Sequence, residues 1–395
     1  MKFFHTADWH LGKLVQGVYM TEDQRYILDA FSKAVEEEKP DAVIIAGDLY
    51  DRAVPPTEAV QLLDDVLGHI VMGLKIPVLA VAGNHDSPSR LDFGSTLMKS
   101  NGYHITGIYT GEDRPVVLKD EAGEVHFHLV PYCDPSVVRH RLGDETIRTH
   151  NDAMKKIVEH IKAGMDPEAR HVLVGHAFVT PFGESEDNTS DSERPLSIGG
   201  AEHVDAHHFA PFDYTALGHL HQAHHVLNET VRYAGSILKY SASEAAHKKG
   251  YFIVELAADG TVEVEKRLLH PRRDIRIIEA EMAELLTHPK SDDYVFVRLL
   301  DASPVLSPME RIRSVYPNAM HVERKHAYLR PEGETDELHI APSQMNDLDR
   351  FRAFYREVKG DSPGVEAEDL FKEILDDMLR QENETVSTGL RPVVK

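Results

Sequence analysis

Residues 2–12, KFFHTADWHLG, join a short apolar strand to the first side chains that could bind a metal ion. Phe3 and Phe4 open the apolar run, and Asp8 and His10 follow it. Because these last two residues are two positions apart, their side chains point to the same side of an extended backbone. A carboxylate and an imidazole side by side at a strand end make half of a metal site, whereas a polar loop after a strand is the simpler interpretation of this stretch alone.

Four further apolar runs end in the same way as the first. Each has the composition of a buried strand and is followed at once by glycine and a residue that can bind a metal ion. Glycine at such a corner permits a sharp turn and a close approach of the backbone to a ligand. The four runs and their corners are 41–46 with Gly47-Asp48, 77–82 with Gly83-Asn84-His85, 171–174 with Gly175-His176, and 214–217 with Gly218-His219-Leu220-His221.

Helix-like segments separate these runs. They cover residues 22–39, 57–74 and 151–162, and each ends near glycine or proline. Strands that alternate with helices predict sheets covered by helices, with ligands beyond the carboxyl ends of the strands. Residues 233–240 and 251–256 have the pattern of further strands.

The corner residues supply carboxylates, an amide and imidazoles, and no thiolate. This donor set suits a divalent ion of borderline to hard character, with Mn²⁺ as the first choice and Mg²⁺, Fe and Zn²⁺ as alternatives. The set is too large for one ion, and two ions that share one carboxylate would use it. Two such ions can hold a phosphoryl group between them and supply hydroxide at neutral pH. The set comprises Asp8, His10, Asp48, Asn84, His85, His176, His219 and His221.

Other polar residues near these strands are left outside the site. His5 lies inside the first strand and is expected to pack or to support the site from behind. Trp9 lies between two candidate ligands, and packing is the preferred interpretation over base stacking. His126 and His128 alternate with apolar residues, which predicts the exposed face of a half-buried strand.

The chain is long and acidic. Its 395 residues are 42% hydrophobic and 28% charged, enough for about two to three domains, and the formal net charge is −23. Affinity for nucleic acid comes largely from neutralising phosphates, so bound cations or a basic partner must help if this chain acts on nucleic acid. The single Cys133 excludes an internal disulfide and a cysteine-based zinc site. No apolar run approaches the ~20 residues that span a bilayer, and no signal segment is evident, so we expect a cytoplasmic protein.

The character of the sequence changes near residue 270. Pro271-Arg272-Arg273 has the composition of a boundary. Residues 271–340 predict a small α+β unit that contains no strand ending in metal ligands. Its expected strands are 276–280, 294–300 and 319–324, and its expected helices are 281–286 and 309–315.

Two further segments carry their own patterns. From residue 341 to residue 395 the chain is charged and largely helical, with a weaker amphipathic helix at 343–358 and a stronger one at 367–379. Residues 182–200 are polar and acidic, and are interpreted either as a solvated loop or as a loop that contacts substrate.

The corner motifs together resemble the calcineurin-like metallophosphoesterase superfamily, and the resemblance covers residues 1 to about 270. Its motifs here are Asp8-x-His10, Gly47-Asp48-x-x-Asp51-Arg52, Gly83-Asn84-His85-Asp86, Gly175-His176 and Gly218-His219-x-His221. Within it, HTADWHLG, GDLYDRAVPP, GNHDSPSRL, SERPLSIGGAEHV and GHLHQ are similar to the branch of nuclease subunits that work with a coiled-coil ATPase of the SbcC type. With these motifs, the resemblance extends through the rest of the chain.

The resemblance implies an α/β fold and a set of residue roles. The fold is a metallophosphoesterase sandwich of two facing sheets flanked by helices, with a small α+β capping domain and C-terminal helices. His85 is surplus to both metal shells and would stabilise the transition state or protonate the leaving oxygen. Asp51 would orient His85. The alternative is that the Asp51 side chain only caps the loop. One ion would be held by Asp8, His10 and His221 and the other by Asn84, His176 and His219, with Asp48 bridging.

The implied function is a metal-dependent DNA nuclease in repair, recombination and replication. It would be a 3′-to-5′ double-strand exonuclease and a hairpin or single-strand endonuclease, working as a homodimer within a heterotetramer with an SbcC-type ATPase. The domains would be 1–270 for the nuclease, 271–340 for capping and DNA binding, and 341–395 for binding the ATPase. A phosphomonoesterase or cyclic-nucleotide phosphodiesterase is the alternative enzyme, and a scaffold that has lost catalysis is the alternative class. The filled ligand positions disfavour the scaffold.

Overall fold

The computed structural model of the protein describes residues 1–112, 114–183, 190–193, 203–324, 347–359, 362–372 and 374. The chain forms two compact units, Met1–Ala327 and Tyr328–Lys395. Within the described ranges, the helices are too short or too polar to cross a membrane.

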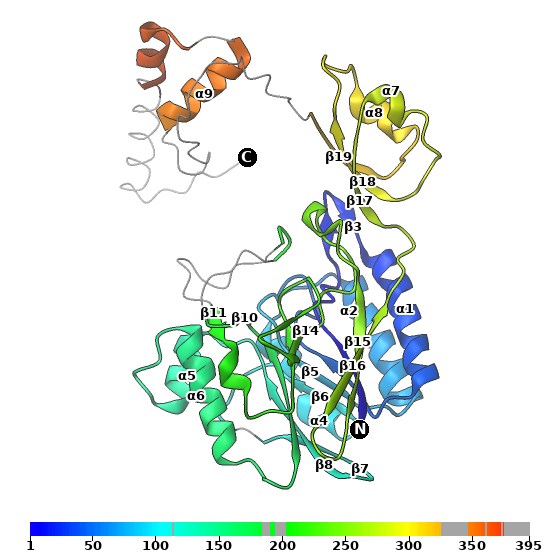
Figure 1. Ribbon diagram of the computed structural model, residues 1–395, viewed down its shortest axis with the longest axis vertical. Coiled ribbons are helices and arrows are strands. Elements are labelled where there is room, and N and C mark those ends of the chain that lie inside the picture. Colours follow the sequence, from blue (N-terminus) through cyan, green and yellow to red (C-terminus); the bar gives the residue numbers. More distant parts are fainter. Residues whose placement is uncertain are drawn as a thin grey trace. The chain divides into compact units, whose positions relative to one another are not determined.

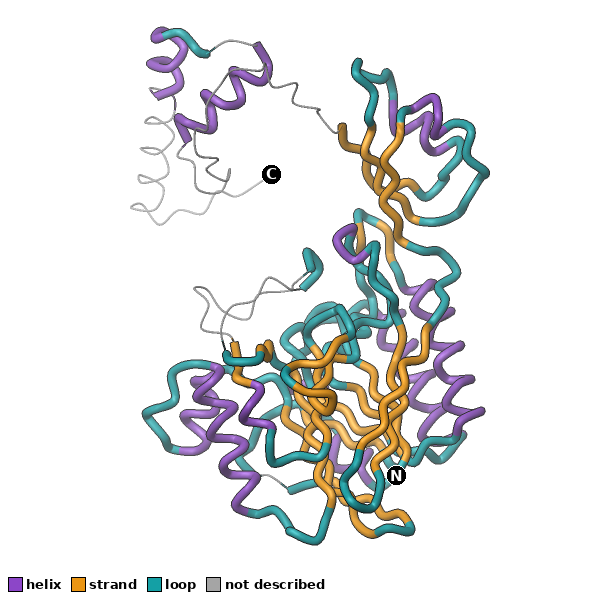
Figure 2. Tube along the Cα trace, viewed as in Figure 1, coloured by secondary structure: helices purple, strands orange, loops and turns teal. Residues whose placement is uncertain are grey.

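Two six-stranded sheets form the body of the first unit (Figures 1 and 2). In each sheet the central strands are parallel, because helices and long loops connect them. The first sheet has the order β16 (Val262–Leu268), β15 (Gly250–Leu256), β1 (Lys2–Thr6), β4 (Ala42–Ile45), β5 (Val78–Val81) and β6 (Tyr103–Thr106). The second has the order β13 (His224–Val226), β14 (Asn228–Tyr233), β12 (Tyr214–Gly218), β9 (Arg170–His176), β8 (Gly123–Val130) and β7 (Val116–Asp120).

Apolar side chains fill the space between the two sheets. The Phe3 ring of β1 meets Phe127 of β8 and Tyr214 of β12 edge-on, with centroids 5.6 and 5.7 Å apart. Ile44 of β4 and Val174 of β9 are fully buried in the same cluster. The central parallel strands β4 and β5 are buried on both faces and are apolar throughout, as parallel strands usually are.

Helices cover the outer face of each sheet (Figure 1). The first sheet packs against α1 (Thr21–Glu38) and α2 (Thr57–Leu67), which continues as a π-helix over Gly68–Gly73. The second packs against α5 (Pro135–Leu142) and α6 (His150–Ala163). This arrangement confirms the predicted sandwich of two facing sheets flanked by helices.

A small parallel sheet follows the sandwich. Its strands are β17 (Ile275–Ala280), β18 (Tyr294–Leu299) and β19 (Ala319–Arg324), packed with α7 (Met282–Leu285) and α8 (Pro308–Arg313) around a core of their own. The sheet is tied to α1 through the buried Asp23, which accepts hydrogen bonds from Tyr294 Oη at 2.7 Å and Arg273 Nε at 3.0 Å. Each of these elements was expected from the sequence within a few residues.

In the second unit, the described residues include two helical segments. These are α9 (Asp347–Lys359) and a helical stretch over residues 365–372. The rings of Phe351 and Phe371 stack with centroids 4.3 Å apart, and Arg352 forms two hydrogen bonds of 2.7 Å to Glu368. Both segments agree with the expected helices as far as they are described, whereas residues 343–346 and 375–379 lie outside the described residues.

Two expectations about the body are wrong. The strand expected at 233–240 ends at Tyr233, because Gly235 turns the chain with a φ of 73°. His128 is 5% exposed rather than on an open face, since its ring stacks on His171 with its Nε2 3.1 Å from His171 Nδ1. A further expectation, that residues 182–200 form a loop, concerns residues that lie largely outside the described ones. The described residues 190–193 form a turn.

Candidate metal centre

Five strand ends gather the predicted ligands at one edge of the sandwich. Asp8 and His10 follow β1, Asp48 follows β4, Asn84 and His85 follow β5, His176 ends β9, and His219 and His221 follow β12. All eight side chains are buried or half-buried. Two contacts between side chains cross the site at 3.0 Å: His10 Nε2 to His221 Nε2, and His176 Nε2 to Asn84 Oδ1.

The backbone at four of these residues is left-handed. The φ angles are 53° at Asp8, 46° at His10, 51° at Asp48 and 108° at His219. Such conformations cost about 1–3 kcal/mol each for residues other than glycine, and persist where the surroundings impose them. At Asp8 and His10, hydrogen bonds between corners hold this conformation: Asp8 N donates to Gly47 O at 3.1 Å, and His10 N donates to Asp48 O at 2.9 Å.

Two glycines are required by close approach of the ligands. A Cβ atom on Gly47, whose φ is 91°, would lie 2.2 Å from His176 Nδ1, and one on Gly83 would lie 2.1 Å from Asp48 Oδ1. In the sequence pattern, each glycine precedes one candidate ligand. In the structure, it makes room for a candidate ligand from a different strand.

The hydrogen bonds of His176 fix which of its nitrogens can bind a metal ion. Nδ1 lies 2.9 Å from the carbonyl oxygen of Ala46, which can only accept, so Nδ1 carries the proton and Nε2 carries a lone pair. Nε2 faces Asn84 Oδ1 at 3.0 Å and Asp48 Oδ2 at 3.5 Å. Three lone-pair donors thus converge on one point, which is the arrangement that a cation requires.

The pKa values of the buried side chains also indicate a cation site. Burial, followed by the neighbouring Asp48 carboxylate, raises the pKa of Asp8 well above its usual range. Burial lowers the pKa values of His10, His176 and His219, so these imidazoles are neutral, the form that binds metals. Two carboxylates buried among neutral imidazoles form a site that divalent cations would stabilise, so the residues present fit such ions.

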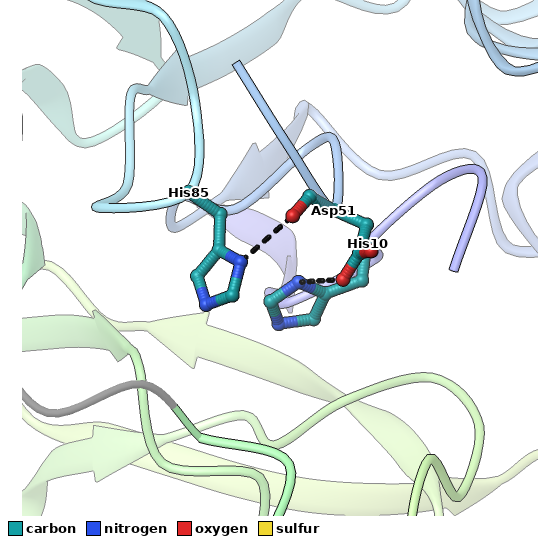
Figure 3. Close-up of side chains that lie close together, drawn as sticks. All are labelled: His10, Asp51 and His85. Carbon is teal, nitrogen blue, oxygen red and sulfur yellow. Dashed lines mark hydrogen bonds and ion pairs between the residues drawn. The ribbon is translucent and has the colours of Figure 1, made fainter. Parts of the chain in front are cut away.

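Figure 3 shows that Asp51 contacts His85 through its backbone. The carbonyl oxygen of Asp51 accepts from His85 Nδ1 at 2.8 Å, whereas the Asp51 carboxylate lies 2.7 Å from Lys13 Nζ and 3.8 Å from His10 Nδ1. His85 Nε2 is buried and has no hydrogen-bond partner among the described residues. The sequence pattern placed Asp51 beside His85 but could not indicate which of its oxygens makes the contact.

Sequence reasoning missed several groups that hold the ligands in place. Asp86 accepts from the backbone amides of Leu49, Tyr50 and Gly83 at 2.9–3.1 Å and so joins two corners. Burial, followed by Asp48, raises the pKa of Asp86 to about 7. The sequence signal that could have identified Asp86 is its position at the end of the Gly83-Asn84-His85-Asp86 motif.

His221 also has unforeseen neighbours. Glu244 Oε1 lies 3.1 Å from His221 Nδ1, and Glu193 Oε1 accepts from the His221 backbone amide at 2.6 Å. Burial alone would raise the pKa of Glu244, but Lys249 and His221 outweigh it and hold that pKa below its usual range. Glu244 lies 23 residues from His221 in the sequence and outside any strand-end pattern, so no local signal indicated it.

Comparison with known proteins assigns the class. Residues 1–223, more than half of the chain, match the family model of calcineurin-like phosphoesterases, and the chain belongs to this family. The fold therefore implies divalent metal ions.

A second match covers residues 271–359. It is to the SbcD_C model, described as the type 5 capsule protein repressor C-terminal domain. The two matches together are consistent with an SbcD nuclease subunit.

Solved structures with a similar fold include two proteins of low sequence identity. A dimetal phosphatase from Danio rerio is 12% identical, with a TM-score of 0.39 over 68% of this chain and 96% of its own. The protein TT1561 of Thermus thermophilus is also 12% identical, with a TM-score of 0.36 over 67% of this chain and 98% of its own.

Proposed function

We propose that this chain is a two-metal DNA nuclease of the SbcD type. It would degrade duplex ends in the 3′-to-5′ direction, cut hairpins and single strands, and act with an SbcC-type ATPase in DNA repair, recombination and replication. The observation that carries the proposal is the cluster of ligands from five strand ends in a chain that also matches the SbcD_C model. We assign residues 1–270 to the nuclease domain, 271–340 to capping and DNA binding, and 341–395 to binding the ATPase.

The proposed metal ligands divide into two groups. Asp8, His10 and His221 would hold one ion, Asn84, His176 and His219 the other, and Asp48 would contact both. Mn²⁺ is the proposed metal, with Mg²⁺ as the alternative. When bound, a pair of divalent ions polarises the phosphodiester and makes water a nucleophile at neutral pH.

His85 is proposed to act on the leaving group. Its Nδ1 donates to the Asp51 carbonyl, which orients the ring and leaves Nε2 as the reactive atom. A protonated Nε2 can donate to the phosphate oxygen that gains charge or to the departing 3′ oxygen. Asp51 would act as a positioning residue through its backbone, while its carboxylate holds Lys13.

The partner proposals rest on exposed surface and on charge. Leu370 and Ile374 are 58% and 52% exposed in the second unit, an apolar surface that suits a coiled-coil groove. Arg272 and Arg273 contact Asp23, and Arg276 pairs with Asp293, so the arginines at the start of the small sheet are already engaged. The ATPase is therefore proposed to supply most of the DNA-binding surface for this acidic chain.

A homodimer is also proposed. Phe93 is 85% exposed at the end of α3 (Pro88–Asp92), and Leu97 is 77% exposed in α4 (Ser95–Lys99). Two large apolar side chains four residues apart on one short segment favour a contact between two copies.

The test compares substrates, metals and two matched variants. The wild-type protein should cleave linear and hairpin duplex DNA and bis-p-nitrophenyl phosphate with Mn²⁺, and should lose both activities when the metal is chelated. Asp48→Asn should abolish both and reduce the bound metal measured by mass spectrometry, whereas Asp29→Asn, on the exposed face of α1, should change neither. Hydrolysis of phosphomonoesters without cleavage of DNA would contradict the proposal and favour a phosphatase.

A further inference from the structure

A fully buried carboxylate stands behind the metal ligand His221. Glu244 is 0% exposed and belongs to a short 3-10 helix, Ala242–Glu244, rather than to one of the five strand-end corners. Its Oε1 lies 3.1 Å from His221 Nδ1, and its Oε2 accepts a hydrogen bond from the ammonium group of Lys249. Lys249 Nζ also donates to His221 O and to Ser236 Oγ, both at 2.8 Å.

The proton positions in this cluster follow from the chemistry of the partners. An ammonium group can only donate, so Lys249 requires acceptors and takes one oxygen of Glu244. Ser192 Oγ donates to Glu244 Oε1 and lies 2.8 Å from His221 Nδ1, so the lone pair of Ser192 faces that nitrogen. Both neighbours of His221 Nδ1 among the described residues, Ser192 Oγ and Glu244 Oε1, therefore act as acceptors, and Nδ1 carries the proton.

We propose that Glu244, held in place by Lys249, is a positioning residue that keeps the His221 proton on Nδ1 and so presents the Nε2 lone pair to a metal ion. The inference deepens the proposed function and rests on its metal site. His221 Nε2 lies 3.0 Å from His10 Nε2, on the side of the ring that faces the other ligands. A carboxylate behind a ligating histidine fixes the ring and its tautomer, and loss of such a partner typically costs about 10–100-fold in metal affinity.

The pairing with Lys249 predicts an unusual effect of a conservative change. In Glu244→Gln, the ammonium group of Lys249 attracts the amide oxygen, and the amide NH₂ then faces His221 Nδ1. That nitrogen must become an acceptor, which moves the proton to Nε2 and removes the ligand. Adding Lys249→Met frees the amide to turn its oxygen toward His221, with its NH₂ near Ser236 Oγ, which lies 3.4 Å from Glu244 Oε2.

The experiment measures Mn²⁺ binding directly, by electron paramagnetic resonance of free Mn²⁺ during titration of the metal-free protein. Glu244→Gln should weaken binding at one of two sites about 10–100-fold, and the double variant with Lys249→Met should recover most of this loss. Asp120→Asn is the control, because it weakens the ion pair with Arg170, which begins β9 at the end opposite to His176, and should leave Mn²⁺ affinity unchanged.

Two outcomes overturn the inference. Unchanged affinity in Glu244→Gln would show that the carboxylate does not position the ligand. Weakened binding without recovery in the double variant would show that Glu244 acts through its charge. If the wild-type protein binds no Mn²⁺, the proposed metal site itself fails, which is a distinguishable result.

A measurement on the wild-type protein keeps the inference testable if a variant does not fold. Nitrogen-15 NMR of the metal-free protein reports the tautomer of each histidine, and the signal of His221 is identified by its loss in His221→Asn. A proton on Nδ1 is expected, and a proton on Nε2 would overturn the inference.

Discussion

Replacing Gly47 by alanine should displace the proposed metal ligand His176 without changing any chemical group of the site. The added Cβ would lie 2.2 Å from His176 Nδ1, and an ordinary contact needs at least 3.4 Å, so the ring must move by about 1.2 Å. The buried ring is held by its hydrogen bond to Ala46 O, so this shift breaks that bond and carries Nε2 away from Asp48 and Asn84. A displacement of about 1 Å at a reacting centre can cost roughly 100-fold in rate.

The alanine also has a backbone cost that must be separated from this effect. Gly47 has a φ of 91°, and a left-handed residue other than glycine costs about 1–2 kcal/mol. Gly17→Ala provides the matched control, because Gly17 has a φ of 81° and no atom within 4 Å of an added Cβ. Both variants should lose about 1–2 kcal/mol in the free energy of unfolding by urea from this strain, and Gly47→Ala should lose more.

Only Gly47→Ala should lose turnover. The assay is hydrolysis of bis-p-nitrophenyl phosphate at saturating Mn²⁺, with bound metal measured in parallel. A Gly47→Ala protein whose rate stays within about threefold of Gly17→Ala would refute the reasoning, since the expected loss is roughly 100-fold. It would show that the corner accommodates a methyl group.

Three further outcomes are expected. His85→Ala should keep its bound Mn²⁺, measured by mass spectrometry, and lose about 10²–10⁴-fold in turnover; loss of metal would make His85 a ligand. Burial lowers the pKa of His128 to about 3 in the folded protein, whereas in the unfolded chain this imidazole has its ordinary pKa of 6.5. Below pH 6.5 the unfolded chain therefore binds a proton that the folded protein does not. The free energy of unfolding should fall with decreasing pH, by up to about 1.4 kcal/mol per pH unit. Urea unfolding of His128→Phe should show a shallower fall, and an identical slope would contradict the assigned pKa. Leu370→Glu with Ile374→Glu should abolish co-purification with an SbcC-type ATPase but preserve hydrolysis of the small ester, whereas Lys372→Glu should retain both; undiminished binding by the double variant would show that these residues do not form the interface.

The sequence predicted the strands and their corners because both depend on local patterns. A buried parallel strand is a continuous apolar run, and the glycine after it marks the turn, so Asp48, Asn84, His176 and His219 could be located without coordinates. The structure brings these residues together, and their roles as metal ligands stay predictions.

The parts that the sequence did not predict depend on contacts between distant segments. Glu244 reaches His221 from a 3-10 helix with no periodic pattern, and the burial of His128 depends on its stacking against His171 of the neighbouring strand. Residues 233–240 have the composition of a strand, but the chain turns at Gly235, whose φ is 73°. Glycine is required there because an added Cβ would lie 2.7 Å from His221 O. Tertiary packing, rather than local propensity, decides each of these cases.

The place of β1 in its sheet has a consequence for how the protein is made. β1 precedes both of its neighbours in the chain, since it lies between β4 and β15, a strand that begins at Gly250. A growing chain on the ribosome therefore keeps one edge of β1 unpaired until β15 has been synthesised. His221, the last of the corner residues, is added 211 residues after His10. A translation product that stops before His221 lacks one of the proposed ligands, so it cannot assemble the complete proposed metal site.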